Sequence, residues 1–516
     1  MKRLVLTTTL LATSLVTGSA ASEPALTFTK LWTHNHGTAD ETPGQLSEIP
    51  AFDPRTNTIW VVGIVGVDVL DADTGARVDH IDVTSVGAVN SVAIHNGLAA
   101  LAVEAATGLP AGPGAAAGRH SPGRVLFYDT KTRELSDGVN NVPVGALPDM
   151  LTFTHDGSKL LVANEGTPCV GPLPASCFYG ARIGTTVPRN FASPVGDPAG
   201  GVTIIDMETR AVLATAGFSG IVPVGDNVRT NTGMDFEPEY IAVNQEGTEA
   251  YVTLQEGNAI GVLDLTTNSF TKVIGLGVKD FNADGNEIDP RNDADPSTIP
   301  PTPALVDFIS VAVKGLYMPD GIAAYEWHDE TYLVMANEGD FREDDGDRRT
   351  ANSADIGAVA PLDKLRVSSA DSSPGHLFAA GARSFSIRDK TGNLIYDSGA
   401  FLDKKAHELG IYDDGRSRDK GVEPEGLTLL DLGGRTYAFV GLERTLISAV
   451  AVFDITDPTE VTFVDMIVTD GDLSPEGMAA YKYRGQNYLA IANEVPGSSG
   501  FSNTTLYRLD RVRPKK

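Results

Sequence analysis

The sequence predicts an all-β fold, a seven-bladed β-propeller, from two observations. A two-strand unit returns along the chain as an acidic tip, a short apolar strand, a tight turn, a second apolar strand and another acidic residue. Most copies are followed by a third strand that ends in aspartate, and then by a fourth. Four-stranded units repeated around an axis are typical of a propeller, and an array of β-sandwiches is the alternative.

The clearest copy of the unit spans residues 148–165. Asp156 and Gly157 separate its two apolar runs, and this pair favours a hairpin because glycine adopts the positive φ that the turn needs. Four more clear copies start near residues 237, 319, 423 and 475, and weaker copies start near residues 48 and 92. Length alone suggests about three domains, but the repeat indicates a single domain over residues 22–516.

The last unit shows only three evident strands, and residues 26–31 supply a spare one near the start of the chain. We expect this strand to complete the last blade, because an unpaired edge strand invites aggregation. Long connections that are functional or disordered are predicted at residues 105–124, 166–200, 271–313 and 339–383.

Residues 1–21 are predicted to be a signal peptide, with basic Lys2 and Arg3, an apolar run and small residues at the cleavage site. A core strand or helix is the alternative for this segment. The mature protein is expected to be secreted or periplasmic, without a membrane span. The formal net charge of -28 disfavours nucleic acid and anionic membranes as partners.

Cys169 and Cys177 are the only cysteines of the chain. In an oxidising compartment they are expected to form a disulfide across a short loop. The alternative is a reduced pair that contributes to a soft metal site, but no nearby histidine supports it.

Carboxylates recur at one register of the repeat. The residue before the first strand and the residue after the second strand lie at the same end of an up-and-down sheet. The predicted pairs, which we call the acidic rim, are Asp149 with Glu165, Glu239 with Glu256, Asp320 with Glu338, Glu425 with Glu443, and Glu476 with Glu494. They are expected to crowd one mouth of the central channel.

Like charges at this density need bound cations, basic neighbours or protonation. Carboxylate oxygens are ligands for hard divalent cations, so a metal, calcium first, is the predicted cofactor. The alternative is that the acidic residues only cap strand ends by accepting backbone N–H bonds.

Two further segments indicate metal binding. Asp280, Asn282 and Asp284 have the D-x-N-x-D-G spacing of a calcium loop, but Arg291 stands where an EF-hand needs its bidentate glutamate. A solvated turn is the alternative there. His34 and His36 are two residues apart, which is compatible with a transition-metal site or with a simple strand end.

No P-loop, no nucleophile elbow and no H-E-x-x-H motif occurs in the sequence. Catalytic residues are therefore unknown at this stage.

Several motifs together resemble the choice-of-anchor I family: Phe236-Glu237-Pro238-Glu239-Tyr240, Ala336-Asn337-Glu338-Gly339-Asp340, Tyr396-Asp397-Ser398-Gly399, residues 416–426, and Ser474-Pro475-Glu476-Gly477. The family includes mesenchyme-specific cell-surface glycoproteins of biomineralising animals and many bacterial secreted proteins. The resemblance implies an exported propeller. Members are often labelled alkaline phosphatase-like, and the animal members are linked to calcium handling. This chain departs from the family pattern in showing no sorting signal at its end.

Two functions follow as hypotheses. The first is a non-catalytic scaffold or cation-binding module. The second is a metal-dependent phosphoesterase, alkaline phosphatase-like or phytase-like, which acts on a small phosphorylated ligand. In the second, ions at the acidic rim would polarise the phosphoryl group, and Arg342 or Arg444 would hold the phosphate.

Overall fold

The computed structural model describes residues 26–105, 121–166, 198–230, 236–293, 304–342 and 347–512. The predicted signal peptide and both cysteines, Cys169 and Cys177, lie outside these residues. Within the described part of the chain the fold is all-β, as predicted, with only two short helices.

The core of the fold consists of seven four-stranded antiparallel sheets. Five of them are formed by strands that follow one another directly in the chain and also lie side by side in chain order. These strands are β2 (Pro50–Asp53), β3 (Thr58–Gly63), β4 (Gly66–Asp71) and β5 (Arg77–Ile81); β6 (Val89–His95), β7 (Leu98–Val103), β8 (Pro122–Asp129) and β9 (Asn141–Ala146); β10 (Pro148–Phe153), β11 (Lys159–Asn164), β12 (Gly201–Asp206) and β13 (Val212–Ala216); β14 (Pro238–Val243), β15 (Glu249–Leu254), β16 (Ala259–Asp264) and β17 (Ser269–Gly275); and β27 (Pro424–Asp431), β28 (Thr436–Leu442), β29 (Ser448–Asp454) and β30 (Thr462–Thr469).

Another sheet contains β20 (Ile322–Trp327), β21 (Glu330–Asn337), β25 (Ser384–Asp389) and β26 (Leu394–Asp397), with an insertion between its second and third strands. The last sheet combines both ends of the described chain in the order β1-β33-β32-β31. Its strands are β1 (Leu26–Asn35), β31 (Pro475–Tyr483), β32 (Gln486–Asn493) and β33 (Asn503–Arg511). The spare N-terminal strand thus completes the last sheet, as the sequence predicts.

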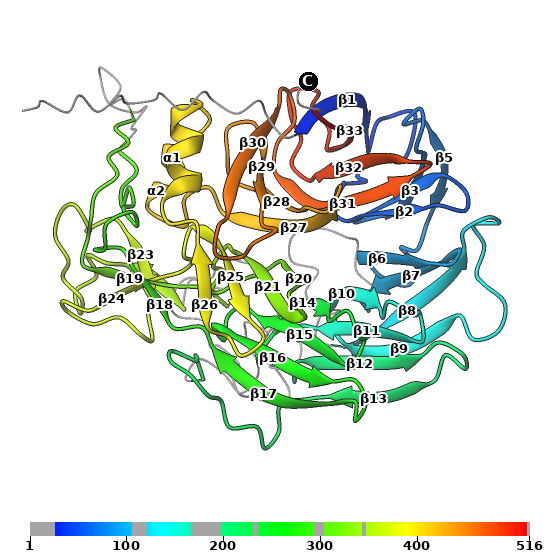
Figure 1. The fold of residues 1–516 in the computed structure, drawn as a ribbon, viewed down its shortest axis with the longest axis horizontal. Helices are drawn as coiled ribbons and strands as arrows, with labels where there is room; N and C mark the ends of the chain where they lie inside the picture. Colours follow the sequence, from blue (N-terminus) through cyan, green and yellow to red (C-terminus); the bar gives the residue numbers. More distant parts are fainter. Residues whose placement is uncertain are drawn as a thin grey trace, which may run out of the picture.

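The first strands of the sheets contact one another in succession: β2 contacts β6, β6 contacts β10, β10 contacts β14, β14 contacts β20, β20 contacts β27, β27 contacts β31, and β31 contacts β2 again. In Figure 1 the strands β6, β10 and β14 lie near the middle of the molecule, whereas β13 and β17 lie at its periphery. The ends of the first strands therefore lie close together, although they are far apart in the sequence.

Apolar clusters fill the spaces between neighbouring sheets. One joins Trp60 of β3 to Leu101 of β7, and another joins Phe439 of β28 to Leu489 of β32. The predicted turn after β10 shows why the hairpins form: Gly157 has a φ of 70°, and the backbone N–H of Ser158 donates to Oδ1 of Asp156 at 2.9 Å. The apolar alternation then places one face of each strand in these clusters.

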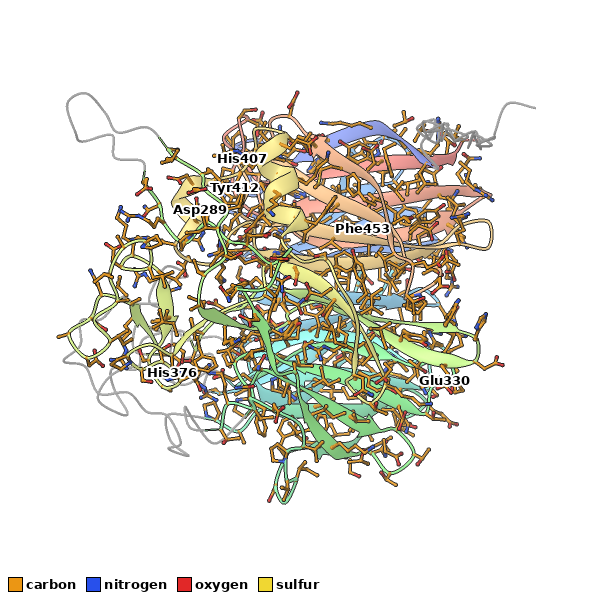
Figure 2. All side chains as sticks on the ribbon, turned by 60° about the vertical axis from the view of Figure 1, so that its left-hand side comes forward. Asp289, Glu330, His376, His407, Tyr412 and Phe453 are labelled. Atoms are coloured by element: carbon orange, nitrogen blue, oxygen red, sulfur yellow. The ribbon has the colours of Figure 1, made fainter. Side chains whose placement is uncertain are left out.

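The long connections at residues 271–313 and 339–383 carry structure of their own. They contribute a three-stranded sheet of β18 (Val278–Asp280), β19 (Val313–Leu316) and β24 (Leu377–Ala379), and a pair of β22 (Arg348–Thr350) and β23 (Arg366–Ser368). The helices α1 (Phe401–Glu408) and α2 (Asp414–Ser417) follow β26. Figure 2 shows Tyr412 and Phe453 near these helices, and both belong to one apolar cluster.

No helix among the described residues is long and apolar enough to cross a membrane.

Candidate metal centre

The acidic tips begin with a repeated backbone irregularity. Each first residue of the acidic pairs follows a proline, and the strand register shifts directly after that proline in β10, β14, β27 and β31. The residue before the proline has a positive φ in several copies, as in Leu147, Glu423 and Ser474. Such bulges bend a strand and re-aim its side chains, so the carboxylates point away from the regular ladder.

The structure brings three of the predicted ligands together at the ends of β10, β11 and β14. Asp149, Glu165 and Glu239 each offer a carboxylate oxygen, and these oxygens lie within 4.8 Å of one another. The pair Asp149 and Glu165 is thus joined by a residue of the next sheet, which no local sequence pattern specifies.

The other predicted ligands form a connected series. Oxygens within 4.8 Å of one another occur in three more groups, which are Asp320 with Glu338 and Glu425; Glu338 with Glu423 and Glu443; and Glu425 with Glu443 and Glu476. Glu256 and Glu494 act electrostatically on members of these groups, since Glu256 raises the pKa of Asp320 and Glu494 raises that of Glu476. Each of the five predicted pairs therefore has at least one carboxylate that interacts electrostatically with a carboxylate of another pair.

Burial and mutual repulsion shift the pKa values of this rim. The pKa values of Glu239, Asp320, Glu425 and Glu476 are raised well above the usual range, first by burial and then by neighbouring carboxylates. Burial, and next Asp340, raises the pKa of Glu256 to about 8, and burial raises that of Glu443 to about 7. The rim thus holds more negative charge than it can keep ionised at neutral pH without cations.

Two carboxylate oxygens of the rim are buried without a hydrogen-bond donor. They are Oε2 of Glu256 and Oε2 of Glu425, and Glu256 is only 6% exposed. A buried polar atom without a partner is costly. A cation, or a proton shared with a neighbouring carboxyl, would satisfy each oxygen.

One side of the rim carries its own cations. The side chain of Lys420 is 5% exposed, and its Nζ contacts Oε1 of Glu338, Oε2 of Glu423 at 3.1 Å and Oδ1 of Asp340 at 3.5 Å. Although burial opposes its charge, these carboxylates raise the pKa of Lys420 well above its usual range. Arg416 also pairs with Glu423, so this side is compensated by the protein itself.

Glu423 is the member of the rim that the sequence prediction missed. The sequence feature that could have identified it is its position, three residues after Lys420 and directly before Pro424. The prediction selected only the residue after that proline, Glu425.

The two candidate phosphate-binding arginines differ in exposure. Arg342 is 2% exposed, and its Nη1 lies 3.5 Å from Oε1 of Glu237. The side chain of Arg444 is 40% exposed, with Nη2 at 2.5 Å from Oε1 of Glu443. Arg444 is therefore the more accessible of the two.

The candidate calcium loop places its charges against lysines. Oδ2 of Asp280 lies 2.7 Å from Nζ of Lys314, and Oε2 of Glu287 lies 2.7 Å from Nζ of Lys404. The backbone N–H of Asn282 donates to Oδ1 of Asp280 at 3.0 Å, which is an Asx-type turn. Calcium at Asp280, Asn282 and Asp284 stays a prediction.

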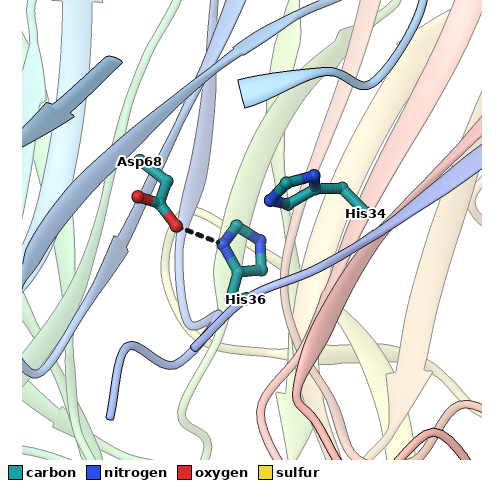
Figure 3. Close-up of side chains that lie close together, drawn as sticks. All are labelled: His34, His36 and Asp68. Atoms are coloured by element: carbon teal, nitrogen blue, oxygen red, sulfur yellow. Dashed lines mark hydrogen bonds and ion pairs between the residues drawn. The ribbon is translucent and has the colours of Figure 1, made fainter. Parts of the chain in front are cut away.

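A histidine cluster lies outside the rim, at the end of β1 in the last sheet and on β4 in the first sheet. His34, His36 and Asp68 offer ligand atoms that lie within 4.8 Å of one another, as Figure 3 shows for their side chains. Burial, and next the charge of His36, lowers the pKa of His34 to about 4, so its ring is neutral at pH 7.

The family model of the choice-of-anchor I domain matches residues 48–458, most of the chain. The chain belongs to the choice-of-anchor I family. This confirms the resemblance carried by the tip motifs. Choice-of-anchor domains are typical of extracellular or surface-anchored proteins.

No curated protein matches this choice-of-anchor I chain. Among solved structures, it is similar to the hydrazine synthase of Kuenenia stuttgartiensis, with 10% identity and a TM-score of 0.47 over 93% of this chain and 100% of that one.

Proposed function

We propose that this choice-of-anchor I protein is an exported, seven-bladed β-propeller that binds divalent cations, calcium first, at its acidic rim and acts as a non-catalytic cation-binding module. The propeller is supported by seven four-stranded sheets whose first strands contact one another in a closed succession. Export is supported by the predicted signal peptide at residues 1–21.

The observation that carries the cation-binding proposal is the group of Asp149, Glu165 and Glu239, whose carboxylate oxygens lie within 4.8 Å of one another. Repulsion alone would be relieved by protonation. A proton shared by two carboxylates relieves part of that repulsion, whereas one divalent cation can take oxygens of all three carboxylates as ligands. The absence of sulfur and nitrogen ligands in these rim groups favours a hard cation such as calcium over a soft one.

We assign the cation to the side of the rim formed by Asp149, Glu165 and Glu239. Their oxygens are close enough to share an ion. Burial and four other carboxylates raise the pKa of Glu239 well above its usual range, and a cation here would relieve that repulsion.

Calcium titration of chelator-treated protein tests the proposal. The expected result is calcium binding with a rise in melting temperature, and a loss of both in Glu239→Gln. Glu246→Gln is the matched control, because Glu246 is an exposed residue in the turn at the other end of the same hairpin. Equal calcium binding by both variants, or no effect of calcium on the wild type, would contradict the assignment.

A second candidate function is a metal-dependent phosphoesterase at the same rim, and the exposure of Arg444 beside Glu443 favours it. A guanidinium can hold a phosphate by paired hydrogen bonds. Assays with a chromogenic phosphate monoester, with calcium and after chelation, separate the two functions. Calcium-dependent turnover that is lost in Arg444→Met would favour the enzyme; binding of calcium without turnover favours the module.

A further inference from the structure

A second cluster of metal-ligating side chains lies where the last sheet meets the first. His34 is on β1, His36 follows that strand, and Glu41 lies in the next loop, whereas Asp68 is on β4. β1 is an edge strand of the last sheet and β4 is the third strand of the first, whereas the acidic rim flanks the first and second strands of the sheets. The cluster is therefore a separate site, and its histidines give it a different metal chemistry from the all-carboxylate rim.

The inner half of the cluster is a satisfied hydrogen-bond network. Asp68 is fully buried, and its carboxylate lies 2.7 Å from Nδ1 of His36, 2.7 Å from Nδ1 of His80 and 3.3 Å from Nη1 of Arg77. The other nitrogen of His36, Nε2, lies 2.8 Å from Oγ1 of Thr504 on β33. Figure 3 shows the bond between His36 and Asp68, with His34 beside it. This half holds the ring of His36 in one orientation.

The outer half contains two atoms without hydrogen-bond partners. Nε2 of His34 and Oε2 of Glu41 are both buried, and neither has a hydrogen bond. The side chain of His34 is only 10% exposed. The two atoms lie 3.4 Å apart, and no hydrogen bond joins them.

That separation fits a shared metal ion. Zinc–nitrogen bonds of about 2.0–2.1 Å and zinc–oxygen bonds of about 2.0–2.2 Å at a tetrahedral angle place the two ligand atoms roughly 3.4 Å apart. The remaining oxygen of Glu41, Oε1, lies 3.8 Å from Nε of Arg77. A carboxylate held through one oxygen and open at the other is the usual arrangement of a ligand with an outer-shell partner.

We propose that this cluster is a transition-metal site that would take zinc. Nε2 of His34 and Oε2 of Glu41 bind the ion, and the hydrogen-bonded pair of His36 and Asp68 lies on the inner side of the site. Imidazole with carboxylate suits zinc and related ions, whereas calcium takes oxygen ligands only. The ion would join His34 of the N-terminal strand to Glu41 in the loop that follows it. A neutral His34 that lies against Glu41 without an ion is the alternative, and metal analysis separates the two.

The test uses the full mature chain without a histidine tag, freed of metal by a chelator and titrated with cobalt and with zinc. We expect a single equivalent of cobalt with the visible absorption of a tetrahedral nitrogen–oxygen site, and its displacement by zinc. His34→Gln and Glu41→Gln should each weaken binding at least about tenfold, since even outer-shell changes cost that much. Zinc should raise the melting temperature of the wild type but not of these variants.

His376→Gln and Glu239→Gln are the controls. His376 is an exposed histidine elsewhere on the chain, and Glu239 belongs to the acidic rim. Both should bind cobalt as the wild type does, also in excess calcium. No cobalt or zinc binding by the wild type, unchanged binding in His34→Gln, or loss of binding in Glu239→Gln would overturn the proposal. If His34→Gln fails to fold, Glu41→Gln decides, because its side chain is 23% exposed.

Discussion

The ammonium nitrogen of Lys420 lies 3.1 Å from Oε2 of Glu423, three residues farther along the chain, and both side chains are buried. The same nitrogen contacts Glu338, which follows the second strand of another sheet. A cation fixed to the protein thus sits among the carboxylates of one side of the acidic rim. The protein thus compensates this side of the rim itself, and the calcium ion that we propose would lie at Asp149, Glu165 and Glu239.

Replacing Lys420 tests this compensation. Lys420→Met should lower the free energy of unfolding by about 3–5 kcal/mol, because Glu338 and Glu423 would keep buried charges without their partner. Urea denaturation in the presence of a chelator measures the change. Lys390→Met is the control, since Lys390 and its partner Glu330 are 46% and 61% exposed and such surface pairs contribute at most about 1 kcal/mol. Equal losses in the two variants would contradict a buried role for Lys420.

The melting temperature should depend on pH without calcium, and calcium should remove this dependence. Burial raises the pKa of Glu443 from 4.5 to about 7 and that of Glu256 from 4.5 to about 8. A carboxyl with a raised pKa in the folded state stabilises the fold below pH 4.5, and this contribution is lost as pH rises through the raised value. The melting temperature of calcium-free protein should therefore fall between about pH 4.5 and pH 8.

Calcium should remove that fall, because an ion at the rim favours the deprotonated carboxylates. Thermal melts across this pH range, with chelator and with calcium, give the comparison. A melting temperature that rises with pH over this window in the chelator would contradict the crowding of buried carboxylates. Identical curves in the two conditions would contradict calcium at the rim.

How much of this could be predicted from the sequence depends on the range of each interaction. The hairpin at residues 148–165 has local causes, an Asp-Gly turn and an alternating pattern, so its strands and acidic ends were predictable. The grouping of Glu239 with Asp149 and Glu165 depends on how neighbouring sheets pack, which no local pattern encodes. The contact of Lys420 with Glu338 likewise joins residues 82 positions apart.

The calcium-loop prediction shows the converse limit. Asp280 and Asn282 do form the turn that their spacing indicates. Their sequence could not reveal that Lys314, on the strand paired with β18, would lie against the same carboxylate. A short motif can predict the local backbone conformation, but it cannot predict which charged side chain of a distant segment will contact it.

Asp68 should be a major stabilising residue of the joint between the first and last sheets. Asp68→Asn removes the buried charge that contacts His36, His80 and Arg77, so the free energy of unfolding should fall by about 3 kcal/mol or more. Denaturation in urea at neutral pH measures the loss. Asp73→Asn, at an exposed position in the turn that follows β4, is the control and should change stability little. A small effect of Asp68→Asn would contradict its role in joining the sheets.

The compensation of one side of the rim predicts unequal roles for two glutamates. Glu443 pairs with Arg444, and Glu423 beside it pairs with Lys420, whereas burial and other carboxylates dominate the surroundings of Glu239. Glu239→Gln should therefore weaken calcium binding at least about tenfold, or about 1.4 kcal/mol, while Glu443→Gln should change it much less. Isothermal titration calorimetry on both chelator-treated variants makes the comparison. A larger loss of calcium affinity in Glu443→Gln than in Glu239→Gln would contradict this assignment. It would place the ion on the side of Lys420, where Glu443 would be one of its ligands.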